Sequence, residues 1–499
     1  MCVRMLPISL RPNGRRAVIV GGGNVAARKA ESLAGAGFQI FVVAERIGDR
    51  LRAILRESEG AFVQRQYRLG DLEQAGIVIA ATDDAALNAR IVTDARAVRA
   101  LVCDAVDPQR GDFTMAATQH IGELTISVDS GGSSPAFARR IVRELTDRLD
   151  SSYADAVRTL SRMRAYVKET FPSTERGAIL RALAERPVAE LATARRSLVC
   201  ATRRSALAMI QSRIVAARLA ERGIATSFLP ITTTGDRDQQ TALDRFGSVG
   251  VFVTELEHAL REGRADYAVH SCKDLAGTLP DDMRIAAIAR REDPRDAFCS
   301  ERYEQFELLP AGSVVGTSSH RRRAQLAALR GDLRYEILRG NVDTRLRKLA
   351  AGEYDAIVVA MAGLKRLGSA CAHVVPFPID RVVPAVGQGA LAIEMRAGDQ
   401  RLRELLYEAV NDLESELCVC AERAALQVMR AGCSAPLGVH AYICADKVAI
   451  EGAYVPPGGS LSRARLERAC ATTAQAEALG TELAAHLNGA AVAARGLER

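Results

Sequence analysis

The sequence contains no tryptophan, and aromatic residues make up only 4% of its 499 positions. It also lacks any stretch apolar enough to span a bilayer, so we expect no membrane insertion. Its net charge of +7 is small for this length, and its arginines neither form long basic blocks nor alternate with aromatic residues. These absences argue against nucleic acid as a partner and favour small anionic molecules.

Cysteine is present, but the patterns that would give it a structural role are missing. The eleven cysteines are odd in number and scattered, and no CxxC motif occurs. They fit neither a disulfide framework nor a zinc cage, so we predict no bound metal. The start of the chain is too short in its apolar part for a secretion signal. A reducing cytoplasm is the expected location.

The chain is long enough for three or more compact units. Residues 16–112 alternate short β-rich runs with helical patterns, which is typical of a parallel sheet with crossover helices. Residues 137–196 are helical and charged, and strand character returns at Ser197. An Ala-rich tail from Thr472 predicts a last helix. We therefore expect an α/β multidomain protein.

A glycine turn follows the first predicted strand, in AVIVGGGNVAARKA. Glycines between a strand and a helix let a pyrophosphate approach the helix N-terminus. Glu45 ends the next predicted strand, where an acid can bond a ribose hydroxyl and favour NAD over NADP. The alternative is a tight turn without a ligand. The residues assigned to the dinucleotide turn are Gly21, Gly22, Gly23, Asn24 and Val25.

The motifs GGGNVAARKA, IAATDDAALN, CDAVDP and ISVDSGGSSPAFAR occur in this order. Together they resemble the bifunctional precorrin-2 dehydrogenase and sirohydrochlorin ferrochelatase family over about residues 1–195. The resemblance implies a Rossmann-like NAD-binding domain over 1–113 and a helical dimerisation and tetrapyrrole-binding segment over 114–195. It implies a homodimer that oxidises precorrin-2 to sirohydrochlorin with NAD, and it leaves open whether ferrous iron is then inserted to give siroheme.

By this resemblance Asp107 is the catalytic acid, and Ser130 lies on the tetrapyrrole-binding face. A carboxylate at Asp107 could take a proton from the macrocycle, although an Asp there could also simply cap a turn. The family usually has Asn at the position of Asp104, and one residue is missing before Phe113, so either acid could be the working one. His120 fits a surface histidine better than a metal ligand. A structural scaffold with a vestigial nucleotide site is the rival for this half.

The second half carries ATRRSALA, AVHSCKDL, REDPRDA, GTSSHRRRAQL, LRGNVDTRLRKL, AVGQGALAIE and AGCSAPLG in order. It resembles the hydroxymethylbilane synthase family, also called porphobilinogen deaminase. The resemblance implies two periplasmic-binding-protein-like α/β domains, over 196–290 with 391–410 and over 291–390, and a small α+β domain over 411–499 that bears a cysteine. The implied reaction joins four porphobilinogen molecules into hydroxymethylbilane.

The resemblance assigns roles to single residues. Cys433 matches the residue that carries the dipyrromethane cofactor through a thioether, and Asp274 matches the catalytic aspartate. Guanidinium groups suit the acetate and propionate groups of pyrroles. The matched cofactor-binding cations are Lys273, Arg321 and Arg322, and the matched substrate-binding residues are Arg203, Ser205, Ser319, Arg339, Arg345 and Arg366.

Several positions depart from the family pattern. Val249 replaces a usual lysine, Ala206 replaces a proline, and Leu275 and Ala276 stand where valine and proline normally follow the aspartate. These changes spare Asp274 and bear on turnover and loop closure. A nonreactive anion-binding module is the rival from another class, and the retention of Asp274 together with Cys433 argues against it.

Overall fold

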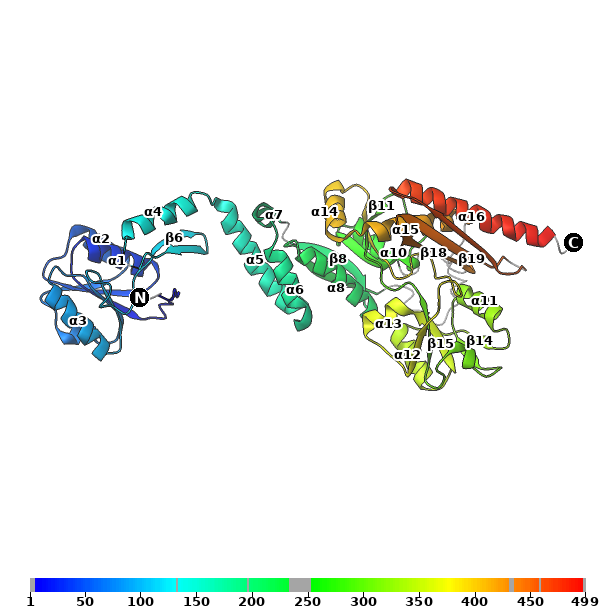
Figure 1. Ribbon diagram of the computed structural model, residues 1–499, viewed down its shortest axis with the longest axis horizontal. Coiled ribbons are helices and arrows are strands. Elements are labelled where there is room, and N and C mark those ends of the chain that lie inside the picture. Colours follow the sequence, from blue (N-terminus) through cyan, green and yellow to red (C-terminus); the bar gives the residue numbers. More distant parts are fainter. Residues whose placement is uncertain are drawn as a thin grey trace. The chain divides into compact units, whose positions relative to one another are not determined.

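The computed structural model describes residues 5–131, 133–194, 197–232, 253–429, 435–456 and 459–496, the last seven of these as backbone only. Two compact units, Met1–Val157 and Arg158–Arg499, divide the chain, and each is described by itself (Figure 1). The architecture is mixed α/β, as the sequence predicted. None of the described helices has the length and apolar character needed to cross a bilayer.

A five-stranded parallel sheet forms the core of the first unit. Its elements are β1 (Arg16–Val20), α1 (Asn24–Gly35), β2 (Gln39–Ala44), α2 (Asp49–Glu57), β3 (Ala61–Gln64), the 3-10 helix η1 (Leu69–Leu72), β4 (Ala75–Ala80), α3 (Ala85–Ala97) and β5 (Leu101–Asp104). The strand order is β3-β2-β1-β4-β5. Ala17 and Ile19 pack with α1 and α2, while Val18 and Val20 pack with α3. Because helices cover both faces, the central strands β1 and β4 are mostly apolar and buried.

A hairpin and a helix follow the sheet in the first unit. They are β6 (Ala117–Ile121), β7 (Leu124–Val128) and α4 (Pro135–Thr146). The antiparallel hairpin was not predicted, although its second strand, LTISV, alternates apolar and polar residues.

Three helices precede the sheets of the second unit. They are α5 (Ser151–Thr170), which crosses the division between the units, α6 (Ser173–Ala184) and α7 (Val188–Thr193). Within the second unit, Met163, Val167 and Leu183 are fully buried. The Tyr166 hydroxyl accepts a hydrogen bond from Thr226 N (3.0 Å) and donates one to Thr226 O (3.1 Å).

Two five-stranded sheets form the body of the second unit, and the chain crosses between them twice. The first contains β8 (Ser197–Arg203), α8 (Ala206–Ala220), β9 (Ala225–Ile231), α10 (Thr254–Arg261), β10 (Tyr267–Ser271), η3 (Cys272–Asp274), β11 (Met283–Ala289), β17 (Leu391–Arg396) and α14 (Gln400–Val410). The second contains β12 (Asp296–Ser300), η4 (Phe306–Leu308), β13 (Val314–Gly316), α11 (His320–Leu329), β14 (Arg334–Glu336), α12 (Val342–Ala350), β15 (Ala356–Ala360), α13 (Met361–Leu367) and β16 (His373–Pro376). The strand orders are β11-β17-β10-β8-β9 and β14-β13-β15-β12-β16. Strand β17 therefore returns to the first sheet after the second is complete.

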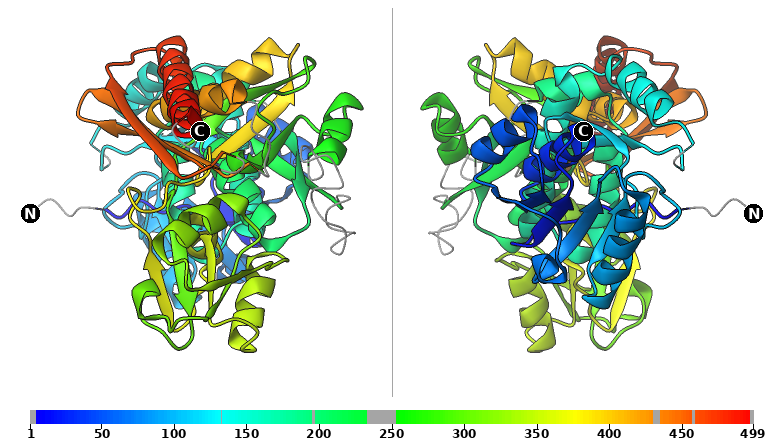
Figure 2. Two further views of the ribbon diagram at one scale, coloured as in Figure 1. Left: turned by 90° about the vertical axis from the view of Figure 1, so that its right-hand side faces the viewer. Right: turned by 90° about the vertical axis from the view of Figure 1, so that its left-hand side faces the viewer.

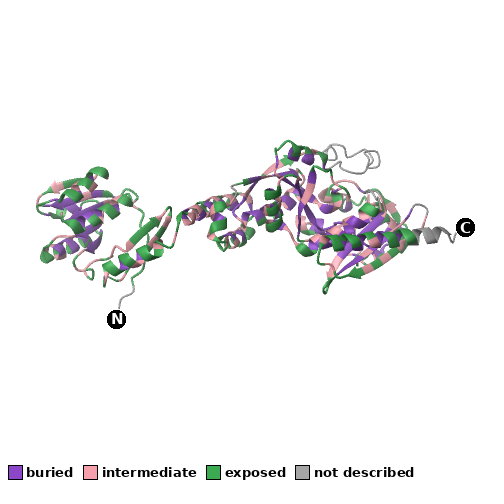
Figure 3. Ribbon diagram, turned by 90° about the horizontal axis from the view of Figure 1, so that it is seen from above, coloured by how far each residue is buried: buried purple, intermediate pink, exposed green. Residues whose placement is uncertain are grey.

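A third, antiparallel sheet completes the second unit. Its elements are α15 (Leu413–Val428), β18 (Leu437–Cys444), β19 (Lys447–Tyr454), β20 (Ser462–Arg468) and α16 (Thr473–Gly496). Helices α15 and α16 pack together on the sheet, and their apolar side chains form one buried cluster with those of β18 and β19 (Figure 2). The last helix begins at the predicted place. Buried residues concentrate in the strands and on the inner helix faces (Figure 3).

Candidate active sites

The turn that holds Asp274 follows directly after β10. Residues Cys272–Asp274 form a 3-10 turn in which Leu275 N donates to Cys272 O (3.2 Å), and Cys272 N donates to Ala390 O (3.0 Å). A Cβ on Gly387 would lie 2.6 Å from the Cys272 sulfur, so only glycine fits there. Cys272 and Leu275 are buried, whereas Asp274 is exposed. Cys272 and Leu275 thus anchor the turn in the interior, and Asp274 between them faces solvent.

Two cations lie near Asp274. Burial lowers the pKa of Lys273 to about 8, against the opposing charge of Asp274. Burial also lowers the pKa of Arg345 to about 10; the charge of Arg322 adds to this effect, and Asp274 opposes it. Arg345 donates from Nε to Gly340 O (2.8 Å). A cation whose pKa is lowered by burial is poorly solvated, so an anionic ligand would stabilise it.

Arg321 and Arg322, at the start of α11, surround one buried carboxylate. Arg321 Nη1 lies 2.6 Å and Arg322 Nη2 2.7 Å from the oxygens of Asp296, which is fully buried. Burial opposes ionisation, but the two guanidinium charges outweigh it and hold the pKa of Asp296 well below its ordinary range. Gln388 Nε2 also donates to Asp296 (2.9 Å). Much of the hydrogen-bonding capacity of both arginines is therefore used inside the protein.

Gln388 connects this buried group to the Asp274 turn. Its Oε1 accepts from Lys273 Nζ (3.4 Å) and from Arg322 Nη2 (3.5 Å). Arg366 donates to the adjacent Gly389 O (2.6 Å), and burial lowers the pKa of Arg366. The segment 387–389, one of the two crossings between the sheets, thus contacts three of the predicted cations.

The remaining predicted residues of the second unit lie at helix starts and strand ends. The Ser205 hydroxyl caps α8 by accepting from Ala208 N (3.3 Å). Likewise, the Ser319 hydroxyl caps α11 by accepting from Arg322 N (3.4 Å). Arg203 ends β8 and Arg339 precedes α12, and both are half-buried.

The glycine turn of the first unit lies at the carboxyl end of β1. A Cβ on Gly21 would lie 2.2 Å from Ala81 O, and one on Gly22 would lie 1.8 Å from Arg46 O, so neither position accepts a side chain. A Cβ on Gly23, the N-cap of α1, would have no neighbour within 4 Å. Gly23, Asn24 and Val25 are exposed there. This open helix N-terminus, where the strand order reverses, fits a pyrophosphate. Glu45 is exposed just after β2.

The two candidate acids of the first unit differ in their surroundings. Asp104 is 1% exposed, and its Oδ1 accepts from Val106 N (2.9 Å) and Asp107 N (3.0 Å). The Asp107 side chain is 45% exposed. Arg110 Nε lies 3.3 Å from Asp104 and 3.0 Å from Asp107. Asp104 therefore stabilises the turn by accepting its backbone N–H groups, whereas the Asp107 carboxylate is accessible to solvent.

Ser130 lies in the turn before α4. Its hydroxyl accepts from Ser134 N (3.0 Å). His120 Nδ1 lies 3.0 Å from Thr125 Oγ1 within the hairpin. Across the described ranges, no group of three or more His, Cys, Asp or Glu side chains is placed to hold a metal.

Comparison with known proteins assigns most of the second unit. The porphobilinogen deaminase dipyromethane cofactor binding domain matches residues 198–404, and the porphobilinogen deaminase C-terminal domain matches 416–489. The porphobilinogen deaminase of Albidiferax ferrireducens is 46% identical over 299 residues, which are 60% of this chain and 95% of that protein. The chain belongs to the porphobilinogen deaminase family. Its deaminase region is joined to a putative NAD(P)-binding region that matches residues 8–117.

Solved structures give more distant likenesses. The precorrin-2 dehydrogenase SirC is 22% identical with a TM-score of 0.31, covering 36% of this chain and 90% of its own. A periplasmic binding protein from Brucella ovis, solved with glutathione bound, is 13% identical with a TM-score of 0.28, covering 47% and 69%.

Sequence reasoning missed two polar residues of the deaminase region. Asp296 lies within the motif REDPRDA and Gln388 within AVGQG, but both motifs indicated only the family resemblance and gave neither residue a role. A buried carboxylate needs a cationic partner. The adjacent arginines Arg321 and Arg322 were the sequence signal that such a partner was available for Asp296. Cys433 and Val249 lie outside the described residues, so the predicted tether remains a prediction.

Proposed function

We propose that the deaminase region is a hydroxymethylbilane synthase that joins four porphobilinogen molecules on a dipyrromethane primer carried by Cys433. The observation that carries this is an exposed carboxylate, Asp274, with poorly solvated cations beside it. Family membership over 95% of a porphobilinogen deaminase supports the same reaction.

The cations suit the substrate because every pyrrole of this kind carries acetate and propionate. Lys273 and Arg345 would each gain a counter-charge when such a carboxylate enters. Arg321 and Arg322 would act mainly by keeping Asp296 ionised and the segment 387–389 in place, with Arg322 also adding positive charge near Arg345. Arg203, Arg339 and Arg366 remain proposed carboxylate ligands, with Ser205 and Ser319 beside them.

The Asp274 carboxylate would stabilise the positive charge that develops on porphobilinogen as ammonia leaves. A fixed carboxylate does this without solvent reorganisation, and it can also accept pyrrole N–H groups. The dipyrromethane group, when bound, supplies the free α-carbon that accepts the first porphobilinogen unit. The Cys433 thiolate is the proposed attachment point, because thioethers resist hydrolysis.

Porphobilinogen consumption by the full chain tests this proposal. Asp274→Ala should retain the covalent primer, seen by mass spectrometry, and lose nearly all turnover. Cys433→Ser should lack the primer and be inactive or strongly impaired. Normal consumption by either variant would refute the mechanism.

We propose that the first unit oxidises precorrin-2 to sirohydrochlorin with NAD. The open N-terminus of α1 at Gly23 supports dinucleotide binding, and Glu45, exposed just after β2, would accept from a ribose hydroxyl. NAD, when bound, accepts the hydride. Asp107, half-exposed beside Arg110, is the proposed proton acceptor. Ser130 would present its hydroxyl proton to the macrocycle, since its oxygen already accepts from Ser134 N.

A homodimer through the first unit is also proposed. Phe137 and Leu145 on α4 are 56% and 42% exposed, and Leu6 and Ile8 are 83% and 65% exposed. A contiguous apolar surface that included these side chains would suit a partner. Analytical ultracentrifugation should give a dimer, and Phe137→Glu with Leu145→Glu should give monomers. A cytoplasmic location remains a prediction.

Anaerobic oxidation of precorrin-2 with NAD is the deciding assay for the first unit. Sirohydrochlorin should accumulate, and adding ferrous iron, here a substrate, tests conversion to siroheme. If oxidation fails while porphobilinogen is consumed, the first unit is a scaffold.

A further inference from the structure

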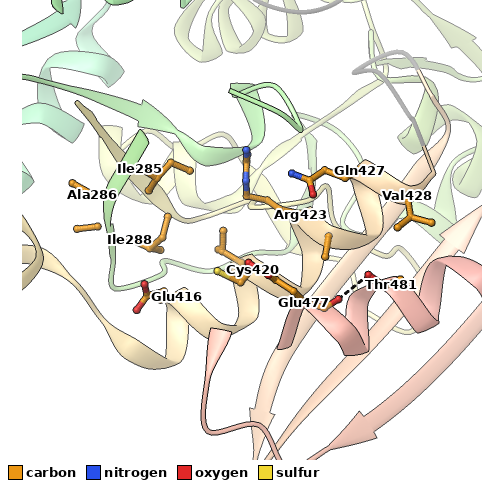
Figure 4. Close-up of a pocket in the computed structure, with 13 residues that line it drawn as sticks. Ile285, Ala286, Ile288, Glu416, Cys420, Arg423, Gln427, Val428, Glu477 and Thr481 are labelled. Atoms are coloured by element: carbon orange, nitrogen blue, oxygen red, sulfur yellow. Dashed lines mark hydrogen bonds between the residues drawn. The ribbon is translucent and has the colours of Figure 1, made fainter. Parts of the chain in front are cut away.

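Helix α15 carries two polar side chains, one helical turn apart, that reach the segment just after Asp274. Arg423 Nη2 donates to Ala276 O (2.8 Å) and to Gly277 O (3.0 Å), and Gln427 Nε2 donates to Gly277 O (2.8 Å). Residues four apart share one face of a helix. Both side chains leave α15 on the same side (Figure 4).

The segment they hold has little regular structure of its own. Between Asp274 and β11 no strand ladder pairs it, and the donors found for the Ala276 and Gly277 carbonyls are the side chains of Arg423 and Gln427. Leu275 is 2% exposed and packs in a buried cluster with Val419 of the same helix. An apolar contact and three hydrogen bonds thus fix this segment to α15.

Arg423 also lies close to the other side of the aspartate. Burial raises the pKa of the Cys272 thiol, and the nearby positive charge of Arg423 opposes that rise. Arg423 therefore acts on residues two before and two or three after Asp274. None of its hydrogen bonds goes to Asp274 itself, whose carboxylate is exposed.

The same helix leads into the predicted tether. Helix α15 ends at Val428, five residues before Cys433 in the sequence. One rigid element thus supports the Asp274 turn and begins the connection to the primer attachment point. A carboxylate that must meet each new substrate needs a position fixed relative to this tether.

We propose that Arg423, assisted by Gln427, is a positioning residue that sets the place of Asp274 for the deaminase reaction. The proposal rests on the proposed hydroxymethylbilane synthase activity. It assigns Arg423 a role in turnover rather than in substrate affinity or primer attachment. Chain positions 275 and 276 depart from the family pattern, and a segment without the usual proline depends more on such external bonds.

A cavity of about 290 Å³ beside Arg423 provides a matched control. Its walls include Arg423 and Gln427 of α15 and Thr481 of α16 (Figure 4). Thr481 donates only to Glu477 O (3.0 Å) and makes no bond to the Asp274 segment. Arg423→Met keeps most of the apolar stem, and Thr481→Val removes polarity from the same cavity without touching the turn.

The first measurement is amide hydrogen exchange of a peptide covering residues 275–279 in the full chain. Arg423→Met should raise its exchange rate at least about tenfold, since the carbonyl anchors are lost, and Thr481→Val should leave it unchanged. Unchanged exchange in Arg423→Met would overturn the proposal whether or not the protein is active.

The second measurement is steady-state porphobilinogen consumption with the primer content determined by mass. Arg423→Met should lower kcat about 10-fold to 100-fold, with KM within about twofold and full primer occupancy. Gln427→Met should have a smaller effect, and Arg423→Lys should recover part of kcat. A kcat equal to that of the active wild type, or a loss explained by missing primer, would refute the positioning role. Inactive wild-type protein would instead refute the proposed function, leaving hydrogen exchange to judge this inference.

Discussion

Asp104 and Asp107 show how two identical side chains, three residues apart, acquire different uses. Asp104 is buried and accepts two backbone N–H groups, whereas Asp107 is half-exposed. We expect Asp107→Asn to lower precorrin-2 oxidation about 100-fold, because a general base is lost. Its unfolding temperature should match the wild type.

The companion variants locate the working acid. Asp104→Asn keeps an oxygen for both N–H groups and should remain stable and active. Asp104→Ala should lower the free energy of unfolding by about 1–3 kcal/mol, because buried donors lose their acceptor. Loss of oxidation in a stable Asp104→Asn protein would reverse the assignment.

Lys273 gives a pH-dependent prediction with a definite sign. Its pKa is about 8 in the folded protein, against about 10.4 for an unfolded lysine. Between these values the unfolded chain binds more protons, so this residue makes the protein more stable as pH rises. In a Cys433→Ser background without primer, Lys273→Met should raise the unfolding temperature at pH 7, and most of this gain should be lost by pH 10 because both states approach deprotonation there. An equal gain at both pH values would contradict the prediction.

At the scale of elements, Tyr166 of α5 hydrogen-bonds the backbone of the edge strand β9 in the first deaminase sheet. Strand β9 is the last in its sheet, and the tyrosine hydroxyl bonds both backbone groups of Thr226, which is 3% exposed. Unpaired edge groups favour non-native strand pairing. The family match begins at residue 198, so α5 adds this contact from outside the matched region.

Tyr166→Phe should therefore destabilise the second unit. We expect a loss of about 1–3 kcal/mol on chemical unfolding, because buried backbone groups lose their partner. Amide exchange at Thr226 should accelerate. Tyr153→Phe, the same substitution elsewhere on helix α5, is the control. Unchanged amide exchange at Thr226 would show that another group can accept the hydrogen bond of its backbone N–H.

These elements also show what the sequence could predict. The glycine turn was predicted from a strand followed at once by glycines and a helix, whereas Asp274 was assigned through the family resemblance of its motif HSCKD. The contacts of Asp296 with arginines 25 and 26 positions later were not recognised, because only the tertiary fold brings them together. The same holds for Arg423, which lies 146 positions from Gly277. Residue identity alone does not distinguish a structural arginine from one that binds substrate.

At the scale of the molecule, each unit has its own buried clusters, so we expect two separable activities. Gly23→Val tests this, because Gly23 has extended backbone angles of −87° and −170° that valine also adopts. An added Cβ at Gly23 would meet no protein atom within 4 Å, so we expect the fold to persist. It would occupy the space proposed for the pyrophosphate, and NAD-dependent oxidation should fall at least about tenfold.

Asp274→Ala is the reciprocal variant. Gly23→Val should consume porphobilinogen at the wild-type rate, and Asp274→Ala should oxidise precorrin-2 at the wild-type rate while losing deaminase turnover. Both assays are run on both proteins, with thermal unfolding as the check on folding. Each variant should lose the activity of its own unit and keep that of the other. A fall in porphobilinogen consumption in well-folded Gly23→Val would mean that the nucleotide site influences the deaminase region, and separate active units would then be the wrong description of this chain.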